Sequence, residues 1–203
     1  MNRPATVLSF LSLGVALGLM IRLIIPVPDT QQTIEWMDNP RGLEAFSLET
    51  EVGNFNNQSL SGRWTIVVFG FLHCPDICPS SLLELASLAD GLAEKGLNQQ
   101  VSFVFVSVDP MRDSVAEIAQ YVQHFHPSIL GATGDEEQLI SLAGNLGIRF
   151  EVSPDDENYT VAHSVTFSII GPGGGFYGRF RPGFDVPNLV RSFMSKFGER
   201  GVI

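Results

Sequence analysis

Cysteine is scarce in this chain. Only two cysteines occur among its 203 residues, which is too few for the disulfide framework that stabilises small secreted domains. The part of the chain that follows the apolar N-terminus can bury roughly 70% of its unfolded surface, so it does not need a disulfide in order to fold. The two cysteines are therefore better explained by chemistry than by covalent cross-linking.

Positive charge is also scarce. Lysine and arginine number 12 against 22 aspartates and glutamates, which gives a net charge of -10 at pH 7. This balance argues against a nucleic-acid-binding surface, which requires clustered positive charge. An acidic domain can still attract a basic partner or a cation. The sequence also lacks internal repeats and low-complexity segments.

One long apolar stretch lies at the N-terminus. Residues 6–21 are apolar apart from small hydroxyl side chains, and the pattern resumes after Arg22 until Pro26. This span reaches the roughly 20 residues that a bilayer requires, provided that Arg22 extends to a headgroup layer. No clear small-x-small cleavage site precedes Pro26. We therefore expect an uncleaved, single-pass membrane anchor at residues 1–25 rather than a removed signal peptide or a buried core helix.

The charges around this span favour a cytoplasmic N-terminus only weakly, since Arg3 precedes it and Arg22 lies at its far end. We expect a bacterial inner-membrane protein whose soluble domain faces the periplasm. The mitochondrial inner membrane is the alternative, and the lack of an Arg-rich, Ser-rich leader disfavours it. Residues 26–41 are predicted to be a linker, and residues 42–203 the folded domain.

Strand and helix patterns alternate in the folded part. Continuous apolar, β-branched runs at residues 65–71 and 101–108 predict central strands that are buried on both faces. Hairpins are predicted around 46–54 and 165–181, and helices near 79–96, 114–125, 135–147 and 185–197. This order predicts an α/β sandwich with a central mixed sheet, and a thioredoxin-like fold satisfies it. In such a sheet the functional cleft lies beyond the carboxyl ends of the strands.

Both cysteines follow the first central strand. Cys74 and Cys78 stand four residues apart, where the strand gives way to a helix. On a helix this spacing places the Cβ atoms about 5–6 Å apart, whereas a disulfide requires about 3.8 Å. Two metal–sulfur bonds of roughly 2.3 Å demand less adjustment. The pair can form a disulfide, reduce one or bind a soft metal, and we expect the helix N-terminus to lower the thiol pKa values.

Two thiolates alone make an incomplete site for most metals. His163 directly precedes the second predicted hairpin, whose entry lies beside the cysteine helix in a thioredoxin-like topology. Two thiolates and one imidazole form a soft, open site that suits copper and holds Cu(I) at low coordination number. Structural zinc would require a fourth protein ligand, and none is evident. The alternative for His163 is an ordinary loop histidine.

Three aspartates near the cysteines have both structural and functional interpretations. Asp76 lies between the cysteines and either complements the helix start or tunes the site. Asp109 and Asp113 follow the second central strand at the same end of the sheet. They are either turn and cap residues or groups that position the ligands.

Together these motifs resemble the Sco/SenC family of membrane-anchored copper proteins. Residues 69–79 match its F-x-H-C-P-D-x-C-P signature, and residues 107–113 match its S-x-D-P-x-R-D segment. Residues 129–134 and 159–164 are similar to its G-L-T-G and Y-x-V-D-H-S segments. The resemblance extends over roughly residues 46–197, and the motifs in this order are specific.

The resemblance implies a thioredoxin-like fold, an N-terminal membrane helix and a copper ion, Cu(I) or Cu(II), bound by Cys74, Cys78 and His163. It implies copper delivery to the dinuclear centre of cytochrome c oxidase subunit II during oxidase assembly. The alternative is a thiol–disulfide reductase, in which Cys74 and Cys78 form a redox pair that keeps the cysteines of that centre reduced. Expected partners are this subunit, other copper carriers or thiol reductases, and the membrane, but no nucleic acid. The family usually has aspartate before the histidine, where this chain has Ala162.

Two further functions are weighed against these. A peroxidase of the peroxiredoxin class is compatible with the fold, although the chain lacks the T-x-x-C placement of that family's attacking cysteine. A copper or redox sensor is the other.

Overall fold

In the computed structural model, the described residues are 34–152, 161–163 and 165–198. One mixed sheet of 8 strands has the order β1-β10-β9-β4-β5-β6-β2-β3. Its centre is the parallel set β4 (Trp64–Gly70), β5 (Val101–Ser107) and β6 (Ile129–Thr133). The predicted anchor at residues 1–25 lies outside the described residues, within which no helix has the length and apolar character to cross a membrane.

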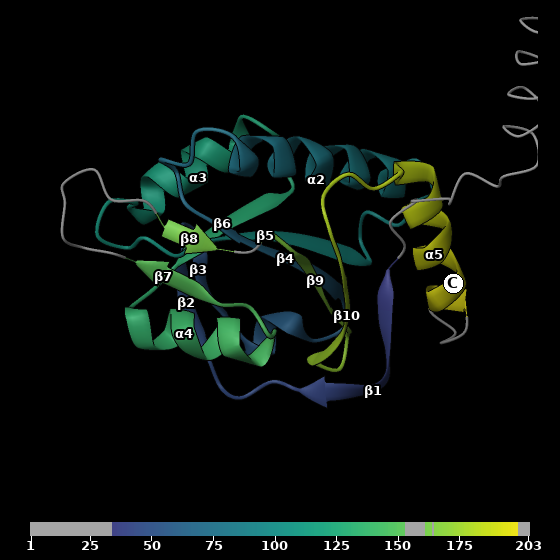
Figure 1. Cartoon of the computed structure of the whole chain (residues 1–203). Helices are drawn as coiled ribbons and strands as arrows, with labels where there is room; N and C mark the ends of the chain where they lie inside the picture. The colour runs from purple at the N-terminus through teal and green to yellow at the C-terminus, as the bar shows by residue number, and fades with distance from the viewer. Residues whose placement is uncertain (1–33, 153–160, 164, 199–203) are drawn as a thin grey trace, which may run out of the picture. The chain divides into compact units, whose positions relative to one another are not determined.

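Helices cover both faces of the central strands. They are α2 (Ile77–Ala93), α3 (Val115–Gln123), α4 (Glu136–Asn145) and α5 (Val186–Gly198). Ile66 and Val68 of β4 pack into one core with α2, α3 and α5, whereas Val67 and Phe69 pack into a second core with α4. Figure 1 shows α2 and α3 on one side of the sheet and α4 on the other. The prediction of a strand buried on both faces is thereby confirmed.

Antiparallel strands flank the parallel centre on both sides. They are β1 (Glu35–Gly42), β2 (Ser47–Thr50), β3 (Gly53–Asn56), β9 (Phe167–Ile170) and β10 (Gly175–Phe180), with a 3-10 turn, η1 (Asn57–Leu60), after β3. The β2–β3 and β9–β10 hairpins confirm the two predicted hairpins. A separate sheet of 2 strands consists of β7 (Phe150–Val152) and β8 (Val161–His163).

Part of the predicted linker, residues 26–41, is a strand. β1 pairs with β10, and its register shifts between Trp36 and Arg41, where Pro40 has no N–H for the ladder. The Trp36 ring packs edge-on against Trp64 and Phe193, with centroids 6.0 and 5.9 Å apart. These long-range aromatic contacts hold the strand, and they explain why a proline-containing, polar segment joins the sheet.

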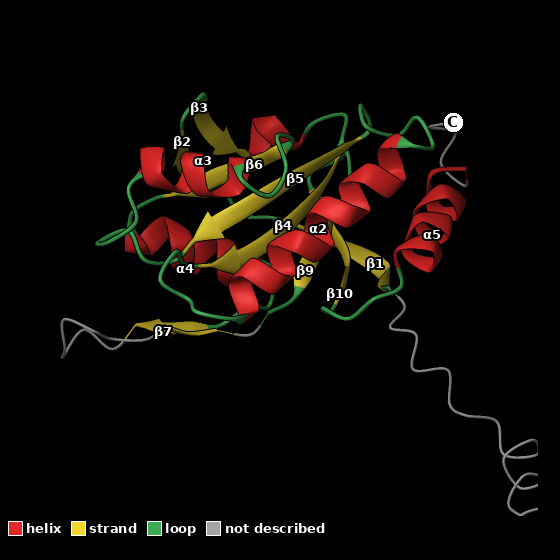
Figure 2. Cartoon of the chain, turned by 90° about the horizontal axis from the view of Figure 1, so that it is seen from above, coloured by secondary structure: helices red, strands yellow, loops and turns green. Residues whose placement is uncertain are grey.

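The strand directions bring several loops to one edge of the sheet. β9 is antiparallel to β4, and Ser168 pairs with Val67, so β9 starts at the carboxyl end of β4. α2 begins after the same end of β4 and then crosses the sheet toward α5 (Figure 2). This end of the sheet is called the carboxyl edge below.

Candidate metal centre

The structure brings Cys74 and Cys78 together at the carboxyl edge. Cys74 lies in the loop between β4 and α2, and Cys78 lies in the first turn of α2. No disulfide joins them, and the residues are only 8% and 3% exposed. A hydrogen bond joins the two side chains, and the backbone N–H of Phe71 donates to the Cys78 sulfur. The two thiols are therefore adjacent and shielded from water.

The cysteine helix begins earlier than the sequence predicts. Its first residue is Ile77 and its N-cap position is Asp76, so Pro79 is the third helical residue rather than the first. Proline is accepted here because the N–H groups of the first turn have no partner within the helix. The Asp76 side chain is exposed and makes no capping hydrogen bond. Its predicted influence on a bound ion stays a prediction.

Burial, not the helix N-terminus, dominates the ionisation of Cys78. Desolvation raises its pKa to about 12, and the hydrogen bond from the Phe71 amide offsets only part of that rise. The expectation that the helix start lowers this thiol pKa is therefore wrong, because removing a thiolate from water costs more than the helix dipole returns. A cation close to the sulfur would supply the missing positive charge.

Gly70 makes room for the Cys78 sulfur. A Cβ atom at this last residue of β4 would lie 2.9 Å from Sγ of Cys78 and 2.6 Å from a ring carbon of Phe105. Both distances are shorter than van der Waals contact allows. The sulfur thus rests directly on the backbone of the central strand, with the Phe105 ring beside it.

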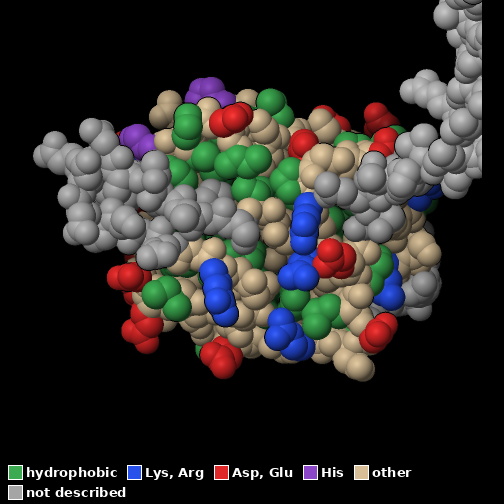
Figure 3. Space-filling model, in the orientation of Figure 1, with side chains coloured by type: hydrophobic (Ala, Val, Ile, Leu, Met, Phe, Trp, Pro, Cys, Tyr) green, Lys and Arg blue, Asp and Glu red, His purple; other side chains and the backbone are tan. Residues whose placement is uncertain are grey.

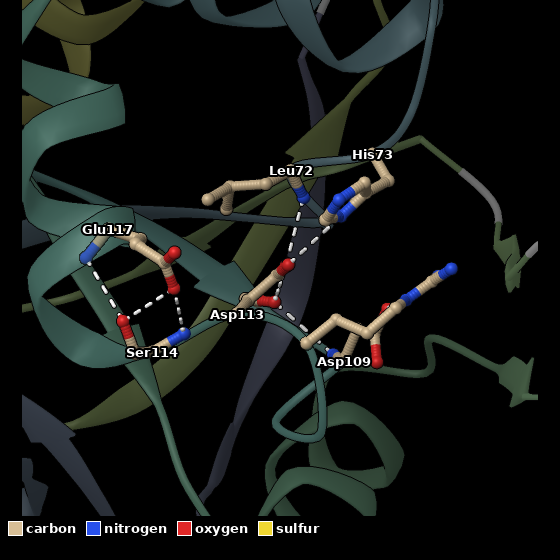
Figure 4. A network of polar contacts seen from close by, with 8 residues as sticks. Leu72, His73, Asp109, Asp113, Ser114 and Glu117 are labelled. Atoms are coloured by element: carbon tan, nitrogen blue, oxygen red, sulfur yellow. Dashed lines mark hydrogen bonds and ion pairs between the residues drawn. The ribbon is translucent and has the colours of Figure 1, made fainter. Parts of the chain in front are cut away.

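A buried carboxylate fixes the loop that leads to Cys74 (Figure 4). The backbone N–H of Leu72 and the hydroxyl of Ser107 donate to Oδ2 of Asp113, at 2.9 and 2.6 Å. The Asp113 side chain is 0% exposed, and its Oδ1 lies 3.5 Å from Nδ1 of His73 without a hydrogen bond. The loop after β4 is thereby tied to the loop after β5, which keeps the cysteine segment in place.

Asp109 supports the same turn from the other side. Its carboxylate accepts a hydrogen bond from Nε of Arg112 at 2.6 Å, and its backbone carbonyl accepts one from the N–H of Asp113 at 3.0 Å. The Asp109 N–H in turn donates to the Ser107 hydroxyl at 3.2 Å. Asp109 and Asp113 are thus turn residues in the structure, and their effect on a bound ion stays a prediction.

His163 ends β8, so its backbone position follows from the hairpin. It pairs with Phe150 of β7, and three residues separate β8 from β9. Because β9 starts at the carboxyl edge, and four residues extend at most about 14 Å, the His163 backbone lies within that distance of Phe167. The side chains of Ala162 and His163 lie outside the described part, so the third-ligand assignment stays a prediction.

The residues described do not complete a metal site by themselves. Within them, no cluster of three or more His, Cys, Asp and Glu side chains has metal-binding geometry. Cys74 and Cys78 are two soft donors that the described residues offer. His163 is the residue predicted as the third donor.

Tyr121 is a neighbour of the thiols that the sequence patterns do not single out. Its hydroxyl oxygen is buried and has no hydrogen-bond partner among the described residues. Burial, followed by the proximity of Cys78 and Cys74, raises the pKa of Tyr121 to about 12. The ring contacts Phe105, with centroids 6.1 Å apart. Its helical spacing marks Tyr121 as core-facing, but only tertiary packing places it near the sulfurs.

The whole folded part matches known proteins. A sequence model of the family described as SCO1/SenC matches residues 37–198. The Bos taurus protein named SCO2 homolog, mitochondrial, is 41% identical over 142 residues, covering 67% of this chain and 53% of that protein. This chain spans about half the length of the curated relatives it matches.

Solved structures agree with this match. The copper-bound ScoI of Arabidopsis thaliana superposes with a TM-score of 0.70 at 34% identity, covering 77% of this chain and 98% of that one. The copper-bound Sco1 of yeast also gives a TM-score of 0.70, at 32% identity, with 77% and 88% covered. The shared architecture confirms the predicted thioredoxin-like fold with a mixed sheet.

Proposed function

Because this chain belongs to the SCO1/SenC family, we propose that it is a copper-binding metallochaperone for cytochrome c oxidase assembly. It delivers copper to the dinuclear centre of oxidase subunit II. The main observation behind the proposal is the pair of adjacent, buried cysteines at the carboxyl edge. The hairpin that ends at His163 leads into the sheet at that same edge. Two relatives of this fold were solved with copper bound.

The chemistry of the donors supports a copper cargo. Two thiolates and an imidazole are soft ligands, which favour copper over hard cations. The buried Cys78 thiol loses its proton only when a positive charge replaces it, so copper binding releases protons from the pair. With three protein ligands the ion keeps an open side, from which an acceptor can take it.

The test is copper binding by the reduced, full-length chain and by a His163→Ala variant. We expect one copper per chain, with two sulfur neighbours and one nitrogen neighbour in X-ray absorption. His163→Ala should weaken binding by about 100-fold or more, because even groups that only orient metal ligands contribute 10–100-fold. His124→Ala, at the exposed C-cap of α3, is the matched control. Unchanged affinity in His163→Ala would remove the third-ligand assignment.

The second candidate is a thiol–disulfide reductase, which the adjacency of the two thiols favours. In that reaction Cys74 and Cys78 become a disulfide while a disulfide in subunit II becomes two thiols, so electrons and protons balance. His163→Ala separates the candidates, since it should abolish copper delivery and leave thiol exchange intact. Negligible exchange with an oxidised subunit II domain excludes the reductase.

We also propose that residues 1–25 anchor the chain in a bacterial inner membrane with the domain in the periplasm. The apolar length of that segment supports the proposal. Membrane fractionation tests it: the full chain should resist alkaline extraction, and protease added to spheroplasts should digest the domain. Full extraction or full protection contradicts it.

A further inference from the structure

A pocket with two arginines in its wall opens near the cysteine pair. Its lining includes Arg179, Arg181, Thr166, Leu146, Ile148 and Val165, and it encloses about 360 Å³. This cavity, called the arginine pocket below, combines guanidinium groups with apolar side chains. Arginine is enriched in protein–protein interfaces, whose centres are otherwise apolar.

The strand register places the arginine pocket at the carboxyl edge. Phe180 of β10 pairs with Phe167 of β9, and Ser168 of β9 pairs with Val67 of β4. The C-terminal end of β10 therefore lies two strand spacings, about 10 Å, from the carboxyl end of β4, where the loop to Cys74 begins. Thr166 and Val165 belong to the connection between β8 and β9. One wall of the pocket is thus the chain that leads directly from His163.

The charge of the pocket differs from that of the chain as a whole. Arg179 donates from Nε to Oε2 of Glu35 at 2.8 Å, while Arg181 makes no ion pair with any described residue. The Arg179 hydrogen bond and the charges of both arginines hold the Glu35 pKa below its usual range. Among the described residues, two arginines and one glutamate thus meet here, which leaves an excess of one positive charge in a chain whose net charge is -10. On the face in Figure 3, Lys and Arg gather across the middle and most Asp and Glu lie toward the margins.

We propose that the arginine pocket docks an acidic segment of the protein that receives the copper, so that the acceptor site comes to rest beside Cys74 and Cys78. The proposal rests on the metallochaperone function. A carboxylate of the acceptor pairs with the guanidinium of Arg181, and flanking apolar atoms bury against Ile148 and Val165. Arg is enriched at the energetic centres of protein interfaces for this reason. Anionic membranes instead attract clusters of four or more basic residues on open surfaces.

The experiment follows copper transfer from the full-length, copper-loaded chain to the copper-free soluble domain of oxidase subunit II. In 20 mM salt, Arg181→Glu should slow the second-order rate by about tenfold, and 0.5 M salt should remove most of the difference. The milder Arg181→Gln should give an intermediate rate. The matched control is Arg63→Glu, an exposed arginine directly before β4 and thus at the opposite end of that strand, roughly 20 Å away. The transfer rate of this control should stay within about twofold of the wild-type rate.

Two further measurements separate the possible results. Copper titration of each variant should give unchanged affinity. Complex formation between the copper-free proteins, measured by fluorescence anisotropy, should weaken in Arg181→Glu whether or not copper is the cargo. If Arg181→Glu binds copper normally and also transfers copper and forms the complex as wild type does, the docking site is wrong. The metallochaperone function is not affected by that result. Arg181-dependent binding to anionic phospholipid vesicles, with normal subunit II binding, assigns the pocket to the membrane and also overturns it.

Discussion

The two segments that carry the predicted copper ligands are supported very differently. The cysteine segment joins β4, in the middle of the 8-stranded sheet, to α2, and Asp113 ties its loop to β5. The β7–β8 hairpin, which ends at His163, is a separate sheet of three-residue strands. A two-stranded hairpin of that length has little stability of its own.

This difference shows which part of the site is preorganised. The positions of the two sulfurs follow from the main core, because Cys74 and Cys78 are both buried within it. The backbone of His163 belongs to a small element outside the main sheet. We therefore expect that substitutions around the cysteines change both stability and copper affinity, and that substitutions in the hairpin change affinity alone.

The largest effect is expected for Asp113→Ala. It leaves the Leu72 N–H and the Ser107 hydroxyl buried without their acceptor, which should lower the free energy of unfolding by about 2–4 kcal/mol. Urea denaturation measures this change. Asp113→Asn keeps one carbonyl acceptor, so its free energy of unfolding should fall by less.

The counterpart in the hairpin is His163→Ala, whose unfolding free energy should change by less than that of Asp113→Ala. Equal losses of unfolding free energy in the two variants would contradict this expectation, because the hairpin would then belong to the same cooperative unit as the cysteine loop.

Gly70→Ala, beside the cysteine segment, should have the next largest effect on stability. The new Cβ would lie 2.6 Å from the Phe105 ring and 2.9 Å from the Cys78 sulfur, so overpacking should cost about 1–3 kcal/mol. Displacement of the sulfur should also weaken copper binding in a chelator competition. The control is Gly144→Ala in α4, where the Cβ meets nothing within 4 Å and a gain of about 0.5–1 kcal/mol is expected. Wild-type copper affinity in Gly70→Ala would show that the sulfur has room to move.

Local patterns predict much of this architecture. The run from Trp64 to Gly70 is apolar apart from Thr65, and it is buried throughout. The capping box of α3 is visible as Ser114 followed three residues later by Glu117, and both of its hydrogen bonds are present. These features depend on neighbours in sequence, which is why propensity and spacing are sufficient to find them.

The remaining features depend on contacts between distant segments. β6 is not predicted because it is short and contains Gly131. A glycine is required there because a Cβ atom would lie 2.6 Å from a methyl group of Ile118. The pKa of Cys78 depends on burial by the whole fold rather than on its helix position. The link from Asp113 to Leu72 joins residues 41 positions apart. No spacing rule within one element reveals such pairs.

The smallest expected effect concerns the exposed helix cap that directly follows buried Asp113. The Ser114 hydroxyl and then the Ser114 N–H donate to Oε2 of Glu117, at 2.6 and 3.1 Å, and lower the Glu117 pKa from its ordinary value of 4.5. The charged form therefore stabilises the fold above that value, and this contribution is lost as the pH falls through the lowered native pKa.

Urea denaturation of Glu117→Gln between pH 7 and pH 3 measures this contribution. At pH 7 the variant should be less stable than wild type, and the gap should close toward pH 3 because the wild-type carboxylate is then protonated as well. Glu136→Gln removes the same charge from the first turn of α4, where Asp135 is the cap, and it controls for the helix dipole alone. A gap that stays constant with pH would assign the loss to side-chain shape rather than charge.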